Sequence, residues 1–407
     1  MFGQWVRRKL GKNAENSILP LDLTAPEMIE DFASLATTEL AQMSVCPLTN
    51  GGQLMLDPQD LKAAFSQKNY SNQPSRFSAL APHNSSKYVA AQVAANIPPF
   101  LDAPRHTVVR KWLSKAIFAN LTDFRSKIPQ AAQLYVSDLP RDEPLLLVET
   151  VARGFAIQTI CDFVGVELEQ ADLKRYTAAM FKLFAPIHDA EEFARTNHAL
   201  AASREALRAQ LVQASDQKTS LFSTMNQFAD LLEGLSLTED EKQLMFCDNA
   251  LLVLADGVEN VEAAIGEVLL KWAEAPENER TEITESFVRD AIHSATPGQT
   301  IARIATNDMH LAGVKCPAGS PVFLSLASAN ARSTDAIDFS FGLGRHRCIG
   351  EGLAISVILA CCQEIAKHTK RIDTSNLRFE PVFGHRWMRD TTIELANAQG
   401  SKESVKQ

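Results

Sequence analysis

The sequence predicts a mainly α-helical protein with a few short β-strands, an α+β fold. A long middle part of the chain is helical in pattern, with apolar residues at helical spacing as in 145–165 and 237–276. Strand-like stretches are short and lie near the two ends, at 52–57 and 309–326. We see no internal repeat and no Pro-, Gly- or Ser-rich linker, so we expect one domain over 21–398.

The individual elements follow in chain order. A basic N-terminal extension over 1–20 precedes the strand GQLMLD, and a helical pattern begins at Pro58. The stretch LLLVETVARGFAIQTICDFVG predicts a helix that ends at Gly165. The stretch MHLAGVKCPAGSPVFLSL predicts a hairpin that turns at PAG and leads into a second strand. The polar tail over 399–407 is predicted to be disordered.

The clearest element is LTEDEKQLMFCDNALLVLADGVENVEAAIGEVLLKWAEAP. Thr238 and Glu241 form a capping box at its start, and Pro276 ends it. About 35 helical residues make a rod of roughly 50 Å, which must cross the centre of the molecule. Asp256 and its polar neighbours interrupt the apolar pattern midway, as a functional site or as a satisfied polar cluster in the core.

Composition and charge exclude several classes of function. The net charge is −9 and the pI is near 5.6, which argues against nucleic acid as a partner. No apolar run reaches the roughly 18 residues of a transmembrane segment. Seven cysteines without regular spacing do not resemble a disulfide framework, so we expect a reduced, cytoplasmic protein.

The stretch FGLGRHRCIG, residues 341–350, surrounds Cys348 with glycines and bases. A thiolate that binds a metal needs hydrogen-bond donors and positive charge nearby. Gly350 and two earlier glycines allow close approach of a flat cofactor, His346 and the flanking arginines supply charge, and Phe341 can cover the sulfur. An inert buried cysteine would explain neither the glycines nor the bases.

This decapeptide matches every position of the haem-binding signature of the cytochrome P-450 family, and the chain resembles that family over most of its length. The resemblance implies the P-450 fold, a long central I helix over a buried haem b (iron protoporphyrin IX), and Cys348 as the iron ligand. The stretch DAPRHTVVRKWL resembles the family's helix at the haem edge, so His106 and Arg110 would bind propionates. In PGQTIARIATNDMHLAGVKCPAG, Arg303 would do the same.

The central helix departs from the family pattern of small residue, Gly, any residue, acid and Thr. Anchored on Gly257, itself expected at the cofactor, this chain has Asp256 at the small position, Glu259 as the acid and Asn260 for the Thr. An amide forms hydrogen bonds but does not readily relay a proton. Asp256, Glu259 and Asn260 are the candidate catalytic residues, with Asp256 and Asn260 one turn apart on the same side.

Two further departures concern the family's Glu-x-x-Arg pair. An ungapped alignment places Asp290 and His293 on these positions, and a shift of one turn would place Ser286 and Arg289 there. After 328–338 the chain runs directly into the cysteine loop, without the longer segment that carries a second Arg in the family. We therefore expect the Arg–carboxylate fork to be lost and the face of the protein on the cysteine side to be more open.

The resemblance implies an O₂-dependent monooxygenase acting on a small apolar or aromatic molecule. Electrons would come from a ferredoxin or flavodoxin and an NAD(P)H reductase. One alternative is an oxidation without oxygen insertion, such as phenol coupling or ring closure in secondary metabolism, with Asp256 as a base. Another is a haem-binding protein with little turnover. Substrate contacts are expected from 70–100, 170–200, 251–260, 295–301 and 383–388.

Overall fold

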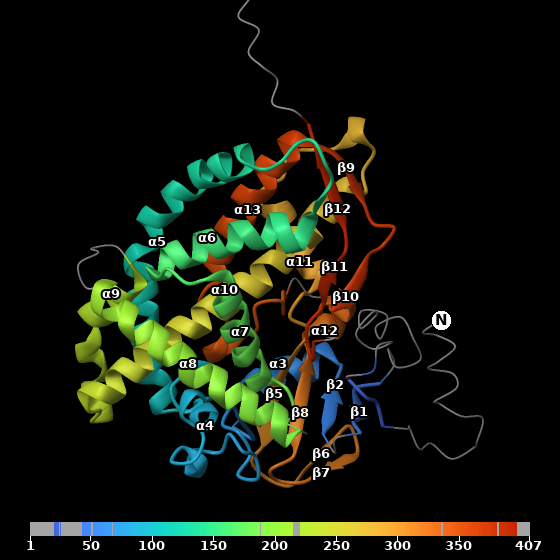
Figure 1. Ribbon diagram of the computed structural model, residues 1–407. Helices are drawn as coiled ribbons and strands as arrows, with labels where there is room; N and C mark the ends of the chain where they lie inside the picture. Colours follow the sequence, from blue (N-terminus) through green and yellow to red (C-terminus); the bar gives the residue numbers. More distant parts are fainter. Residues whose placement is uncertain are drawn as a thin grey trace, which may run out of the picture.

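The computed structural model describes residues 20–23, 25, 43–49, 52–66, 68–187, 189–214, 220–334, 337–380 and 382–396. The helices are the main elements, and the long α10 runs through the middle of the molecule (Figure 1). Their bounds are α3 Pro58–Ser66, α4 Val89–Ala94, α5 Arg105–Ser137, α6 Arg153–Val164, α7 Gln170–Phe181, α8 Ala190–Ala214, α9 Leu221–Gln227, α10 Glu239–Ala273, α11 Glu285–Ala295, α12 Leu326–Arg332 and α13 Glu351–His368. The predicted mainly helical fold is confirmed.

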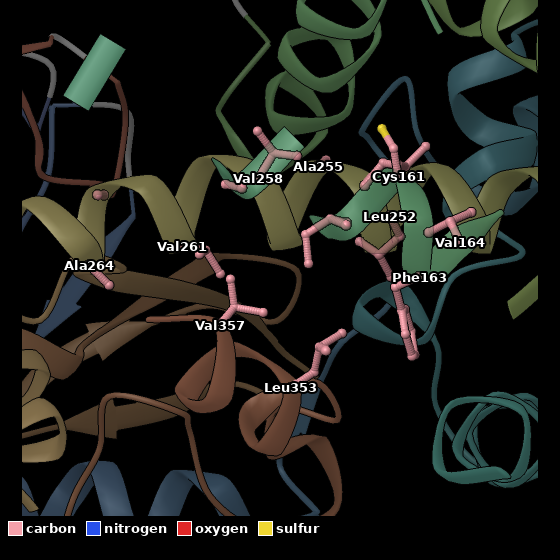
Figure 2. Packing of buried hydrophobic residues seen from close by; sticks show 14 of the residues in the cluster. Cys161, Phe163, Val164, Leu252, Ala255, Val258, Val261, Ala264, Leu353 and Val357 are labelled. Carbon is pink, nitrogen blue, oxygen red and sulfur yellow. The ribbon is translucent and has the colours of Figure 1, made fainter. Parts of the chain in front are cut away.

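The central helix α10 has the predicted length and the predicted cap. It contains 35 residues, and the hydroxyl of Thr238 accepts from the Glu241 N–H while the Glu241 carboxylate accepts from the Thr238 N–H. Side chains of α10 pack against α6 and α13 in one large apolar core (Figure 2). Residues of this contact are Cys161, Phe163, Val164, Leu252, Ala255, Val258, Val261, Ala264, Leu353 and Val357.

The strands lie at one side of the molecule and form small sheets (Figure 1). The largest sheet has the order β1-β2-β8-β5-β3, in which β2 runs parallel to β8 and the other neighbours are antiparallel. Its strands are β1 Val45–Pro47, β2 Gln53–Met55, β3 Tyr70–Ser71, β5 Thr300–Ala305 and β8 Pro321–Ser325. The smaller sheets contain β4 Leu145–Leu146, β6 Met309–Leu311, β7 Val314–Cys316, β9 Thr369–Asp373, β10 Arg378–Glu380, β11 Trp387–Arg389 and β12 Thr392–Leu395.

The predicted turn of the late hairpin is wrong. Strands β6 and β7 form the hairpin, which turns at Ala312 and Gly313, both with positive φ. The PAG segment instead leads into β8, which pairs with β5 and β2 rather than with β7. Two positive φ values in succession are the geometry of a two-residue hairpin turn, and an alanine at the first position gives no sequence signal for it.

The helix predicted from residue 145 begins later than expected. Leu145–Leu146 form β4, Leu147–Ala152 form a short π-helix, and α6 then runs to Gly165, whose φ of 82° ends it as predicted. The N-terminal extension, except for residue 20, and the tail over 399–407 lie outside the described residues. Within the described part of the chain, no helix combines the length and the apolar character of a membrane span.

Candidate functional site

The Cys348 loop lies directly before α13 and is held by its own backbone. Gly342 and Gly344 both have a φ of 67°, a conformation that favours glycine. The Cys348 N–H donates to the Phe341 carbonyl at 2.8 Å. The Gly350 N–H donates to the Cys348 sulfur, and a Cβ at Gly350 would lie 4.0 Å from that sulfur. The loop thus directs a backbone N–H at the sulfur, and Gly350 leaves no side chain beside it.

The thiol of Cys348 and the carboxyl group of Asp256 on α10 lie within range of electrostatic interaction. Each side chain is accessible although protein atoms surround it, so each faces a space inside the fold. Burial and, to a lesser extent, the Asp256 carboxylate together raise the pKa of Cys348 to about 11. Burial raises the pKa of Asp256 to about 7. The structure therefore brings the predicted iron ligand and one predicted catalytic acid into electrostatic contact.

Five basic side chains gather beside this space without an anionic partner. They come from α5, β5 and the cysteine loop, and within the described ranges none of them forms an ion pair; they are His106, Arg110, Arg303, Arg345 and His346. The rings of His106 and His346 lie 3.8 Å apart between centroids, and the Nε2 atoms of both are buried without a hydrogen-bond partner among the described residues. Arg303 is only 6% exposed.

Burial, with repulsion between neighbouring bases, lowers the pKa values of His106, Arg303 and His346 in this basic cluster. The pKa of His106 falls to about 4 through burial and through its neighbours Arg110 and Arg345. That of His346 falls to about 2, and burial lowers the pKa of Arg303 to about 10. Asp102 attracts His106 and Arg303, but its carboxylate already accepts from Ser71 Oγ and the Asn72 N–H.

The groups around Cys348 are suited to binding a haem, which has two carboxylates. The thiol is enclosed, and among the described residues the neighbouring imidazole Nε2 atoms have no hydrogen-bond partner and the arginines no anionic partner. A haem would supply the missing negative charge, because buried cations are stable only when paired. The sequence assigned His106, Arg110, Arg303 and His346 to the cofactor, and the structure brings all four together near Cys348. Their contacts with a haem, like those of Phe341 and Gly350, stay predictions. Arg345 joins the same cluster.

The other predicted residues of α10 have different surroundings. Both oxygens of the Glu259 carboxylate are engaged, one by Arg153 Nη2 at 2.7 Å and the other by Thr177 Oγ1 at 2.9 Å. A Cβ at Gly257 would lie 3.0 Å from Ile160 on α6, so Gly257 faces that helix. The side-chain oxygen of Asn260 is buried and has no hydrogen-bond partner within the described part of the chain. The cofactor contact of Gly257 and the catalytic role of Glu259 therefore remain predictions without support from this packing.

Glu259 belongs to an ion network that sequence reasoning missed. Arg153 of α6 also binds Glu262, at 2.5 and 2.9 Å, and Glu262 binds Arg389 of β11 at 3.0 Å. Arg389 in turn binds Glu380 of β10 at 2.7 Å. The spacing of Glu259 and Glu262 places both on one face of a helix, but nothing in the sequence identifies their distant partners.

A cavity of about 1030 Å³ opens between α6, α7 and the β10–β11 hairpin, beside this network. Its apolar wall includes Phe181, Phe383 and Trp387, and charged side chains line the rest. Of the expected substrate-contacting stretches, 170–200, 251–260 and 383–388 contribute to it, whereas 70–100 and 295–301 do not. Neither Cys348 nor Asp256 lines this cavity.

The two positions of the expected Glu-x-x-Arg pair have other partners in the described structure. Asp290 binds Lys271 at 2.6 Å, and His293 Nδ1 lies 3.4 Å from Asp338 Oδ1, so these two predicted positions do not pair with one another. Arg289 instead binds Glu351, in the first turn of α13. Neither alignment therefore forms an Arg–carboxylate fork between its two positions in the described structure, as predicted, and Arg289 makes a single contact with a carboxylate of another helix.

Comparisons with known proteins agree with this geometry. No protein-family model matches the chain. It is 26% identical over 288 residues to the vitamin D(3) 25-hydroxylase of Pseudonocardia autotrophica, covering 62% of this chain and 66% of that protein. It is 22% identical over 344 residues to a biotin biosynthesis cytochrome P-450 of Bacillus subtilis, covering 77% and 83%.

A solved structure has the same fold. It is the cytochrome P-450 enzyme CxnD, described as acting in C–S bond formation in chuangxinmycin biosynthesis. The TM-score is 0.75 at 18% identity, and the match covers 94% of this chain and 99% of that one. Together with the cysteine loop and the basic cluster, these similarities show that the chain belongs to the cytochrome P-450 family of haem-thiolate oxidoreductases.

Proposed function

We propose that the protein binds haem b through Cys348 and catalyses O₂-dependent monooxygenation of a small apolar or aromatic molecule. The observation that carries this proposal is the accessible Cys348 thiol, enclosed beside five basic side chains that lack an anion. His106, Arg110, Arg303 and His346 would hold the two propionates through charge-assisted hydrogen bonds. Bound to Cys348, the haem would supply O₂ activation, which electron donation from the thiolate favours.

The substrate would enter by the cavity between α7 and the β10–β11 hairpin. Its aromatic wall suits an apolar or aromatic ligand, because such side chains bury large areas and stack on flat molecules. Electrons would come from a separate ferredoxin or flavodoxin and its NAD(P)H reductase, as in the family that the sequence resembles. A cytoplasmic location agrees with seven cysteines that are all free.

The proposal is tested by the spectrum of the ferrous carbon monoxide complex. Thiolate ligation gives a red-shifted Soret band, and Cys348→Ser should abolish this band while much of the fold survives. Cys161→Ser is the matched control, because burial raises the pKa of that thiol to about 12 and its side chain lies on α6. An unchanged band in Cys348→Ser would refute haem-thiolate ligation at this residue.

A second candidate function is oxidation without oxygen insertion, such as phenol coupling or ring closure. Two observations favour it. Asp256, with a pKa raised to about 7, lies within electrostatic range of Cys348, where it would act as a base toward a phenol. Asn260 stands where the family has a hydroxyl, and its amide does not readily relay a proton. The C–S bond-forming enzyme of the same fold shows that the fold also carries out bond formation.

Product formation by the wild type, Asn260→Thr and Asp256→Asn distinguishes the two functions. With surrogate redox partners and an aromatic library, a monooxygenase gives hydroxylated products, and Asn260→Thr should raise the coupling of NAD(P)H oxidation to product. A coupling enzyme gives joined products, and Asp256→Asn should lower the rate roughly 10²–10⁴-fold. The wild-type rate should rise with pH through about pH 7, as Asp256 loses its proton.

The loss in Asp256→Asn should shrink as the pH approaches the pKa of the phenol, because the substrate then arrives ionised. Full activity of Asp256→Asn at neutral pH would exclude its role as a base. No product from any substrate would instead support a haem-binding protein with little turnover.

A further inference from the structure

Glu351 joins two arginines from different parts of the chain beside the cysteine loop. Arg347 binds it in a bidentate fork, Nε to Oε2 at 2.8 Å and Nη2 to Oε1 at 3.0 Å. Arg289 of α11 adds a third bond, Nη1 to Oε1 at 2.9 Å. The Glu351 side chain is 15% exposed, less than either arginine. Bidentate Arg–carboxylate pairs fix geometry as well as charge, so this carboxylate links α11 rigidly to the loop.

Arg347 directly precedes Cys348, and it is held on a second side. Its backbone carbonyl accepts from Arg110 Nη2 of α5 at 2.6 Å. The next N–H, that of Cys348 itself, donates to the Phe341 carbonyl. The peptide unit that carries the thiol is therefore tied to α5 through its carbonyl and to α11 through the Arg347 side chain and Glu351.

The other contacts between α11 and this region are weaker. His293 Nδ1 lies 3.4 Å from Asp338 Oδ1, a long hydrogen bond, and Asp290 binds Lys271 of α10 rather than the loop. Arg289 also binds Glu285, one turn earlier on its own helix, which orients the guanidinium but makes no connection to the loop. Of these contacts, the bond from Arg289 to Glu351 is the strong ionic link from α11 to the cysteine loop.

We propose that Glu351, together with Arg289 and Arg347, is a positioning residue that fixes the Cys348 loop for thiolate ligation of the haem. This inference rests on the proposed haem-thiolate function. The carboxylate does not touch the sulfur. It orients the Arg347 side chain and thereby the peptide unit between Arg347 and Cys348. Groups that orient a metal ligand in this way commonly change metal affinity 10–100-fold when they are replaced.

The test compares Glu351→Gln with Glu285→Gln in the haem-loaded protein. Both variants remove one carboxylate from Arg289 while keeping the shape of the side chain, but only Glu351 reaches the loop. The measurements are the fraction of the ferrous carbon monoxide complex with the red-shifted Soret band and the rate of haem loss to an acceptor protein. We expect Glu351→Gln to lower the fraction and to speed haem loss on the order of tenfold, and Glu285→Gln to change neither.

Arg289→Gln removes the other partner of the same bond, on α11. It provides a second test if Glu351→Gln folds poorly. It should lower the thiolate-ligated fraction in the same direction. The Glu351→Gln/Arg289→Gln double variant should lose less than the sum of the two single losses, because both variants break one link. A Glu351→Gln variant that unfolds more readily but keeps the wild-type Soret fraction and haem-loss rate would overturn this inference alone. A wild-type protein without the red-shifted band would overturn the proposed function as well.

Discussion

Two groups of charged side chains lie inside the fold, and they differ in how their charges are balanced. In the network of Arg153, Glu259, Glu262, Arg389 and Glu380, every member has an opposite charge within 3.0 Å. In the basic cluster beside Cys348, within the described part of the chain, no member forms an ion pair. The network is balanced by its own side chains, whereas the described residues leave the charge of the cluster for a bound anion to neutralise.

The difference separates architecture from ligand binding. A buried charge without a partner destabilises the fold. Such charges are therefore expected where a bound ligand of opposite charge offsets this cost. Removing a member of the ion network should therefore destabilise the protein in every state. Removing a member of the basic cluster should harm only the haem-bound state and relieve repulsion in the haem-free protein.

The largest effect on stability is expected for Glu262→Ala. This side chain is fully buried between Arg153 and Arg389, and its loss leaves two buried cations with one partner each. We expect the free energy of unfolding to fall by about 3 kcal/mol, at the low end for a broken buried pair, because Glu259 and Glu380 remain. Chemical denaturation measures it. Asp123→Ala, which breaks an exposed pair with Lys127, should cost less than about 1 kcal/mol.

Equal losses in Glu262→Ala and Asp123→Ala would mean that the network contributes no more than an ordinary surface pair.

Arg303→Ala should have opposite effects on the two states of the protein. Haem retention should weaken by about 1.5–3 kcal/mol, the range for a hydrogen bond to a charged group. The haem-free protein should keep or gain stability, because burial already lowers the pKa of Arg303 to about 10 and Arg345 repels it. Haem titration and unfolding of the haem-free protein measure the two effects. His106→Ala and Arg110→Ala should behave alike, and unchanged haem occupancy in all three would refute this cluster as the propionate site.

The sequence was informative where the signal is local. The capping box at Thr238, the loop at Cys348 and the basic positions on α5 and β5 each depend on a few neighbouring residues. The partners of these residues depend on contacts across the chain. Glu351 meets Arg289 across 62 residues and Arg153 meets Glu262 across 109, distances over which a single sequence carries no pairing signal.

The misplaced hairpin has the same origin. Residues 317–319 have the composition of a turn, and the true turn at Ala312 and Gly313 shows its geometry only through backbone angles. Strand β8 pairs with β5 and β2 over long separations: Leu324 lies opposite Ile301, 23 residues away, and Phe323 lies opposite Leu54, 269 residues away. Such registers are set by burial of whole strands.

A smaller, pH-dependent effect follows from His106. Its pKa is about 4 in the haem-free fold and near 6.5 when unfolded, so between these values the unfolded chain binds more protons. Stability of the haem-free protein should then rise with pH from about 4 to 6.5, at most about 1.4 kcal/mol per pH unit from this residue. His106→Gln should flatten that part of the profile. A bound propionate would stabilise the protonated imidazole, so the slope should also shrink in the haem-loaded protein.

An equal slope in wild type and His106→Gln would show that other groups set this dependence.

The smallest effect is expected for Gly257→Ala, which tests whether Gly257 serves packing against α6 or contact with the cofactor. A Cβ there would lie 3.0–3.2 Å from three carbons of Ile160, which is 1% exposed and has little room to move. Overpacking of this kind costs roughly 1–3 kcal/mol, and the better helix propensity of alanine returns about 1 kcal/mol. The net loss of stability should be about 1 kcal/mol, with haem retention unchanged. Gly234→Ala, with no atom within 4 Å of its Cβ, is the control and should cost less. If Gly257→Ala weakens haem retention while stability is unchanged, Gly257 contacts the cofactor as its sequence position predicts, and the packing against α6 is secondary.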